Sequence, residues 1–191
     1  MGMVVTTRCA AMKPFKRNAM MIEARRLGVY IERLGIAEAT SLGSYNVFRT
    51  RFGVTPLERM VATNHMMSKI WGKSINSSPT NTHWTLSHLN TYFYTQGGLA
   101  AFMLQMDERW EPNEIVSLLN VKQDMYGPAN LSLYGEIGIV IRISDKVSRL
   151  QTLTDNKAEV VNKAEDGIHD TLSDIVGYSI LGLIMVTPTL A

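Results

Sequence analysis

The stretch EDGIHDTLSDIVGYSILGLIMV, residues 165–186, decides the fold of this chain. Its second half is among the most apolar segments of the sequence, and its first half places Asp166, Asp170 and Asp174 four residues apart. Residues at that spacing share one face of a helix, so we predict a long helix with a row of carboxylates beside its apolar face. The first turns of a helix favour anions, which accounts for Asp166 but not for Asp174, next to the apolar run. A carboxylate that close to a core requires a counter-charge or a metal ion.

A second long apolar helix is predicted just before it, over residues 132–153. In GEIGIVIRISDKVSRL, residues 135–150, Glu136 heads a stripe of apolar side chains at helical spacing: Val140, Ile143, Val147 and Leu150. The other side of this helix carries charged side chains three and four residues apart: Arg142, Asp145, Lys146 and Arg149. The connection to residues 165–186 is short and charged, which favours antiparallel packing of the two helices.

The charged side chains of these two helices allow two interpretations. In the first, they are solvated surface groups whose salt bridges contribute little stability. In the second, acids from both helices hold a divalent cation, while Arg142, Lys146 or Arg149 contacts phosphate oxygens. Because all the ligands of such a cation are oxygen atoms, the second interpretation points to Mg²⁺ or Mn²⁺ and not to zinc.

The rest of the chain also shows helical periodicity, so the predicted fold class is all-α, a helical bundle. Helices are expected over residues 16–35, 55–72 and 84–106, and from about residue 111 onward. Thr55 is the predicted cap of the helix over 55–72, with Pro56 in its first turn and Glu58 three residues after the cap. The pair Gly97–Gly98 weakens the prediction of a helix over 84–106. Asn113 is a candidate cap for the helix that follows.

The composition is that of an ordinary globular protein, with 46% hydrophobic and 19% charged residues among 191. A single cysteine excludes an internal disulfide framework and fits a cytoplasmic location. No stretch reaches the roughly eighteen apolar residues of a membrane span. The net charge of +2 is uneven, since residues 1–100 hold 12 Lys/Arg and 4 Asp/Glu, whereas residues 101–191 hold 7 and 13. The basic half faces either a polyanion or the acidic half of the same fold or of a partner subunit.

Two segments together resemble a known family. YGPANLSLYGEIGIVIRISDKVSRLQTL followed by EDGIHDTLSDIVGYSILGLI is similar to a phage family called nucleotide modification associated domain. Members carry a GE…R-x-x-D-K-x-x-R-L helix and then a helix of the form E-D-T-L-x-D-x-x-x-Y. That family in turn resembles the all-α, MazG-like nucleotide pyrophosphatases. These are helical bundles, usually oligomeric, that bind Mg²⁺ through acids on two adjacent helices and cleave nucleoside triphosphates to monophosphate and pyrophosphate.

The resemblance, which covers roughly Lys122 to Leu183, assigns roles to individual positions. Glu136 corresponds to the acid of the first metal-binding helix and is the candidate to activate the attacking water. Asp170 and Asp174 correspond to the acids of the second helix. The substrate-binding positions that it implies are Lys122, Tyr126, Arg142, Asp145, Lys146 and Arg149. Glu136 stands without the second acid that MazG-like enzymes carry on the first helix.

The resemblance implies a Mg²⁺-dependent (or Mn²⁺-dependent) hydrolase that converts a nucleoside triphosphate to monophosphate and pyrophosphate, acting as a homo-oligomer. Three alternatives remain open. One is a non-catalytic module that binds a nucleotide, or a nucleic acid through the basic half. Another is an HD-type phosphohydrolase built on His169 and Asp170 with upstream histidines. The third is a purely structural helical protein. In each case we expect a basic helical region over 1–110 and a helical core over 111–191, forming one compact unit.

Overall fold

The computed structural model describes residues 15–34, 42–76, 85–126, 129–155 and 161–187, apart from some side chains at helix ends. Within these ranges every regular element is a helix, which confirms the all-α prediction. In chain order the helices are α1 (Arg17–Arg33), α2 (Leu42–Phe52), α3 (Pro56–Asn76), α4 (Leu86–Met106), α5 (Pro112–Tyr126), α6 (Ala129–Asp155) and α7 (Val161–Val186).

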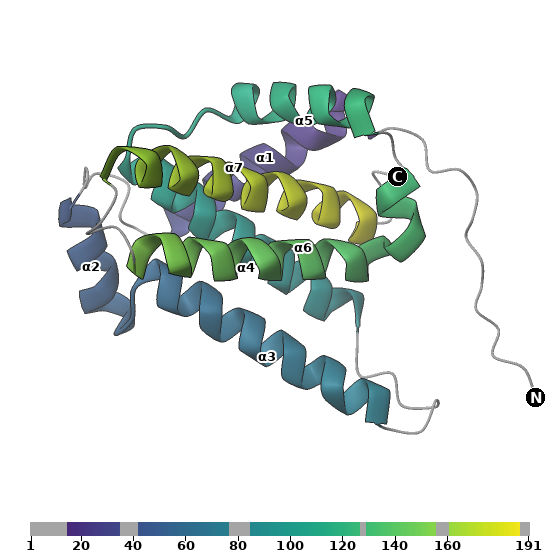
Figure 1. The fold of residues 1–191 in the computed structure, drawn as a ribbon, viewed down its shortest axis with the longest axis horizontal. Coiled ribbons are helices and arrows are strands. Elements are labelled where there is room, and N and C mark those ends of the chain that lie inside the picture. Colours follow the sequence, from purple (N-terminus) through teal and green to yellow (C-terminus); the bar gives the residue numbers. More distant parts are fainter. Residues whose placement is uncertain (1–14, 35–41, 77–84, 127–128, 156–160, 188–191) are drawn as a thin grey trace, which may run out of the picture.

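Helix α4 runs through the middle of the bundle (Figure 1). It packs against α7, α1 and α3, while α7 packs in addition against α6 and α5. Helix α1 also contacts α5, and α2 contacts α3 and α4. Helices from residues 1–110 and from residues 111–191 therefore share one hydrophobic core.

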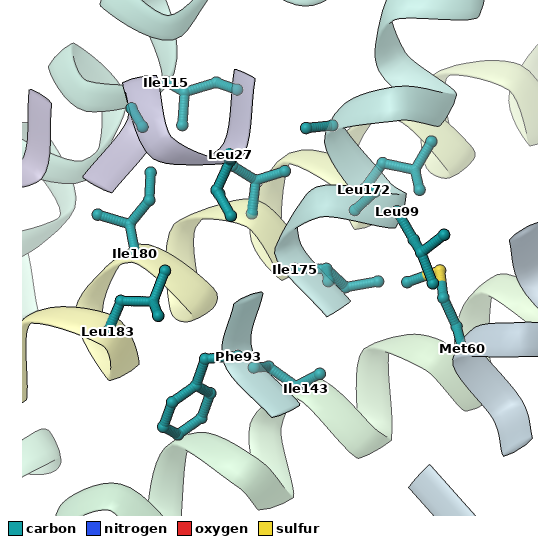
Figure 2. Close-up of a cluster of buried hydrophobic side chains, with 14 of the residues drawn as sticks. Leu27, Met60, Phe93, Leu99, Ile115, Ile143, Leu172, Ile175, Ile180 and Leu183 are labelled. Carbon is teal, nitrogen blue, oxygen red and sulfur yellow. The ribbon is translucent and has the colours of Figure 1, made fainter. Parts of the chain in front are cut away.

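The apolar half of α7 supplies the centre of that core. Figure 2 shows Ile180 and Leu183 of α7 near Leu27 of α1, with Phe93 of α4 and Ile143 of α6 beside them. All of these side chains are almost completely buried. Each buried aliphatic or aromatic side chain of this size contributes about 1.5–3 kcal/mol to folding. None of the described helices has the length and apolarity needed to cross a membrane.

The helix predicted over residues 84–106 is confirmed, and Gly97 and Gly98 do not interrupt it. They lie where α4 approaches its neighbours most closely. A Cβ atom on Gly97 would lie 2.6 Å from Ser179 Cβ of α7, and one on Gly98 would collide with the ring of Tyr30 of α1. The lower helix propensity of glycine is offset here because its small size lets three helices pack without a gap.

The predicted start of α3 is confirmed, with the reciprocal hydrogen bonds of a capping box. Thr55 N donates to Glu58 Oε2 at 2.7 Å, and Glu58 N donates to Thr55 Oγ1 at 3.2 Å. The start of α5 differs from the prediction. Pro112 occupies its first position, so Asn113 lies inside the first turn and is not the cap.

Helix α2 was missed because its sequence lacks a regular apolar stripe. Phe48, which is fully buried, holds it in place, with ring centroids 4.6 Å from Phe52 and 5.5 Å from Phe102 of α4. An aromatic contact with a distant helix is a tertiary interaction, and local periodicity does not report it.

The two long C-terminal helices are present and somewhat longer than predicted. Helices α6 and α7 run antiparallel (Figure 1). Gly135, with φ 55° and ψ −144°, kinks α6 near its beginning, so its regular inner part starts only after this residue. The positive φ is readily adopted by glycine and disfavoured in residues with a side chain.

Candidate functional site

Two lysines from different helices meet one carboxylate on α7. Lys122 Nζ of α5 lies 2.5 Å from Asp174 Oδ1, and Lys146 Nζ of α6 lies 2.6 Å from Asp174 Oδ2. The side chain of Asp174 is only 12% exposed, whereas those of Lys122 and Lys146 are 37% and 23% exposed. We call these three residues the Lys–Asp–Lys cluster. The two lysines supply the counter-charge that Asp174 requires because it lies next to the apolar run.

The three residues lie at the edge of the hydrophobic core. Asp174 immediately precedes the buried Ile175 on α7, and Lys146 precedes the buried Val147 on α6. On α5, Lys122 follows the buried Leu119 by three residues. Amphipathic periodicity thus brings each helix to the others through its apolar face, and the long lysine side chains place their ammonium groups at the margin of that contact.

The charges in the cluster stabilise one another. Burial disfavours the charged form of Asp174, but the hydrogen bonds and positive charges of Lys122 and Lys146 outweigh it and lower the pKa of this carboxyl. Burial likewise disfavours the charged form of Lys122, but the hydrogen bond to Asp174 and the nearby charges of Asp174 and Asp170 raise its pKa. Asp174 and Lys122 are therefore both ionised near neutral pH.

Other predicted site residues surround the cluster at the surface. Arg142 and Arg149, one turn before and about one turn after Lys146 on α6, are exposed, as is Asp145. Asp170, one turn before Asp174 on α7, is exposed as well. The side chain of Tyr126 lies outside the described part of the chain. The arginines, lysines and acids that were predicted as site residues thus lie on neighbouring turns of α5, α6 and α7.

Glu136 does not join the cluster. It lies ten residues before Lys146 on α6, which corresponds to about 15 Å along a helix axis. Two contacts set the antiparallel register of α6 and α7: that of Lys146 with Asp174, and that of Leu153 with Gly167, where a Cβ would lie 3.5 Å from Leu153 Cδ1. In this register, Glu136 stands about ten residues further along α7 than Asp174.

The structure therefore does not bring Glu136, Asp170 and Asp174 to one cation within a single chain. Ligand oxygens must lie about 2.0–2.6 Å from a Mg²⁺ or Ca²⁺ ion, and these acids are at different heights along the helix pair. The described residues contain no group of three or more His, Cys, Asp or Glu side chains able to hold a metal ion. Both oxygens of Asp174 are also in contact with ammonium groups.

His169 takes part in a different contact. Its Nε2 lies 3.0 Å from Asp107 Oδ2, just after the end of α4. His88 forms part of the cap of α4 through Thr85, and His83 lies outside the described residues. The arrangement that an HD-type phosphohydrolase requires is not found among the described histidines and acids.

Sequence reasoning selected Lys122, Lys146 and Asp174 but missed that they bind one another. It also missed Tyr178, a partly buried side chain one turn after Asp174 whose proximity contributes to the raised pKa of Lys122. Its four-residue spacing from Asp174 was the available signal.

The fold and the cluster define an all-α bundle with paired lysines and a carboxylate on its last three helices. Residues 122–186, about a third of the chain, match the sequence model of a family described as Nucleotide modification associated domain 1. That segment includes the whole Lys–Asp–Lys cluster. No curated protein and no solved structure shows significant similarity to the chain. The likeness to MazG-like enzymes remains a prediction.

The shifted pKa values of the cluster predict how stability depends on pH. The folded-state pKa of Asp174 lies below the unfolded value of about 3.9, so its stabilising contribution is lost as the pH falls through the lowered pKa. The folded-state pKa of Lys122 lies above about 10.4, so its contribution is lost as the pH rises through the raised pKa.

Urea unfolding of the wild type and of Asp174→Asn, measured from pH 3 to 11, tests this pH dependence of stability. We expect a difference on the order of 1 kcal/mol at pH 7 that becomes smaller toward both extremes, and a pH-independent difference would contradict it.

Proposed function

We propose that this protein binds nucleotides by their phosphate groups at the Lys–Asp–Lys cluster and hydrolyses a nucleoside triphosphate to monophosphate and pyrophosphate. The observation that carries the proposal is the convergence of Lys122 and Lys146, from two helices, on one carboxylate inside the segment that matches a nucleotide modification associated family. The binding step rests on this geometry, and the reaction rests on the resemblance.

The chemistry of the cluster suits a phosphate chain. Two ammonium groups and one carboxylate leave a local excess of one positive charge, and the exposed Arg142 and Arg149 on α6 add two more. Asp145 and Asp170 offset part of that charge at the surface. Ammonium and guanidinium groups form strong, charge-assisted hydrogen bonds with phosphate oxygens, and both kinds are present within a few helical turns.

The predicted divalent cation enters this proposal as part of the substrate. Because the described residues offer no group of three ligands for a resident ion, we propose that Mg²⁺ (or Mn²⁺) arrives as the complex of the nucleoside triphosphate. The residues of this chain then have a separate task, which is to hold the phosphate oxygens and neutralise charge that develops as pyrophosphate leaves.

A second candidate function is nucleotide binding without hydrolysis. The separation of Glu136 from the cluster favours it, because Glu136 is the acid to which the resemblance assigns the activation of water. In that case the cluster senses or sequesters a nucleotide.

Incubation with each NTP and dNTP, with Mg²⁺ or Mn²⁺, separates the two functions through the release of pyrophosphate. We expect turnover of at least one triphosphate, and a loss in kcat/KM of at least about tenfold in Lys146→Gln, which removes one phosphate ligand. Lys69→Gln is the matched control, because Lys69 is an exposed lysine on α3, away from the cluster. Binding without pyrophosphate would favour the second function, and absence of binding would exclude both.

A further inference from the structure

The carboxylate of Asp174 lies between two ammonium groups, in the position that a bound phosphate would take. Each of its oxygens contacts a different ammonium group, at 2.5 and 2.6 Å, so the two nitrogens lie within roughly 7 Å of each other. That span matches one phosphate group or two linked ones. A ligand that takes the position between Lys122 and Lys146 must displace the carboxylate from at least one of them.

We propose that Asp174 is an internal stand-in for a phosphate and makes the site selective for linked phosphates over a single phosphate. This inference rests on the proposed nucleotide binding and adds the class of ligand: a diphosphate or triphosphate chain. Asp174 is thereby a specificity-determining residue whose removal strengthens the binding of phosphates.

The selectivity follows from a comparison of charges. A ligand that replaces Asp174 must bring more negative charge to the two lysines than the single charge of the carboxylate. It must also tolerate the displaced carboxylate, which remains on α7 a few ångströms away. A single phosphate brings about 1.5–2 negative charges near pH 7, whereas a linked pair brings more and extends over both ammonium groups.

The cluster is arranged so that such an exchange is open to solvent. The side chains of Lys122 and Lys146 are 37% and 23% exposed, whereas that of Asp174 is 12% exposed. A ligand therefore approaches the ammonium groups first.

Isothermal titration calorimetry with inorganic pyrophosphate and inorganic phosphate, in EDTA at pH 7, tests the inference without metal or turnover. In the wild type we expect measurable binding of pyrophosphate and much weaker binding of phosphate. In Asp174→Asn we expect pyrophosphate to bind at least about tenfold more tightly and phosphate binding to become measurable. Glu32→Gln is the matched control, with a change of no more than about threefold, because Glu32 is an exposed acid on α1, a helix that contributes no residue to the cluster.

Each result decides between the hypotheses. Equal or weaker binding of pyrophosphate by Asp174→Asn overturns the stand-in role, while nucleotide binding by the wild type would still support the proposed function. If neither protein binds pyrophosphate or any nucleotide, the proposed function is wrong as well. Asp174→Ser is a second variant that removes the carboxylate, and its side chain differs in shape from asparagine. Circular dichroism identifies which variants are folded, and a fall in affinity in either folded variant also overturns the inference.

Discussion

Replacement of both lysines, Lys122→Gln together with Lys146→Gln, is expected to weaken nucleotide binding at least about 100-fold. The reason is the loss of two charge-assisted hydrogen bonds to phosphate, each worth about 1.5–3 kcal/mol, together with the repulsion of the ligand by the unpaired Asp174. Calorimetry with the Mg²⁺ complex of the preferred triphosphate measures the effect. A loss of less than about fivefold would show that the nucleotide binds elsewhere.

The double variant needs a control for stability, because it leaves a largely buried carboxylate without a charged partner at a cost on the order of 1–3 kcal/mol. The triple variant with Asp174→Asn removes that charge too. We expect it to recover much of the lost stability but none of the nucleotide binding that depends on the lysines. Recovery of binding together with stability would mean that the lysines act only on the fold.

Replacement of Phe93 by alanine is expected to lower the free energy of unfolding by about 3–5 kcal/mol, the range for buried aromatic side chains. Phe93 on α4 is completely buried (Figure 2). Its ring lies so close to Gly182 of α7 that a Cβ on this glycine would lie 2.7 Å from the ring. The substitution leaves a cavity between the two most central helices. Urea denaturation followed by circular dichroism measures the change.

Tyr134→Ala is the matched control for Phe93→Ala, because Tyr134 is an aromatic residue on α6 that is 63% exposed. We expect its free energy of unfolding to change by no more than about 0.5 kcal/mol. Equal effects of the two substitutions would contradict the assignment of the α4–α7 contact as the centre of the core.

Local patterns were sufficient to predict most of the helices. The apolar periodicity of residues 165–186 and the capping box at Thr55 and Glu58 depend on residues within a few positions of one another. The same local reasoning missed α2, which depends on Phe48 reaching α4, and it did not explain why Gly97–Gly98 lie inside α4, where close helix packing outweighs low propensity. In both places a contact between distant segments decides the outcome.

For the candidate site, the sequence by itself determined which side chains are present and which share a helix face. It identified Asp174 as a carboxylate in need of a partner, and the resemblance placed Lys122 and Lys146 among the candidate substrate-binding residues. Only the tertiary structure decided that these three contact one another and that Glu136 stands about 15 Å away along α6. The physical reason is that helical periodicity fixes the direction in which a side chain points, whereas the register between helices is set by how their buried faces interlock.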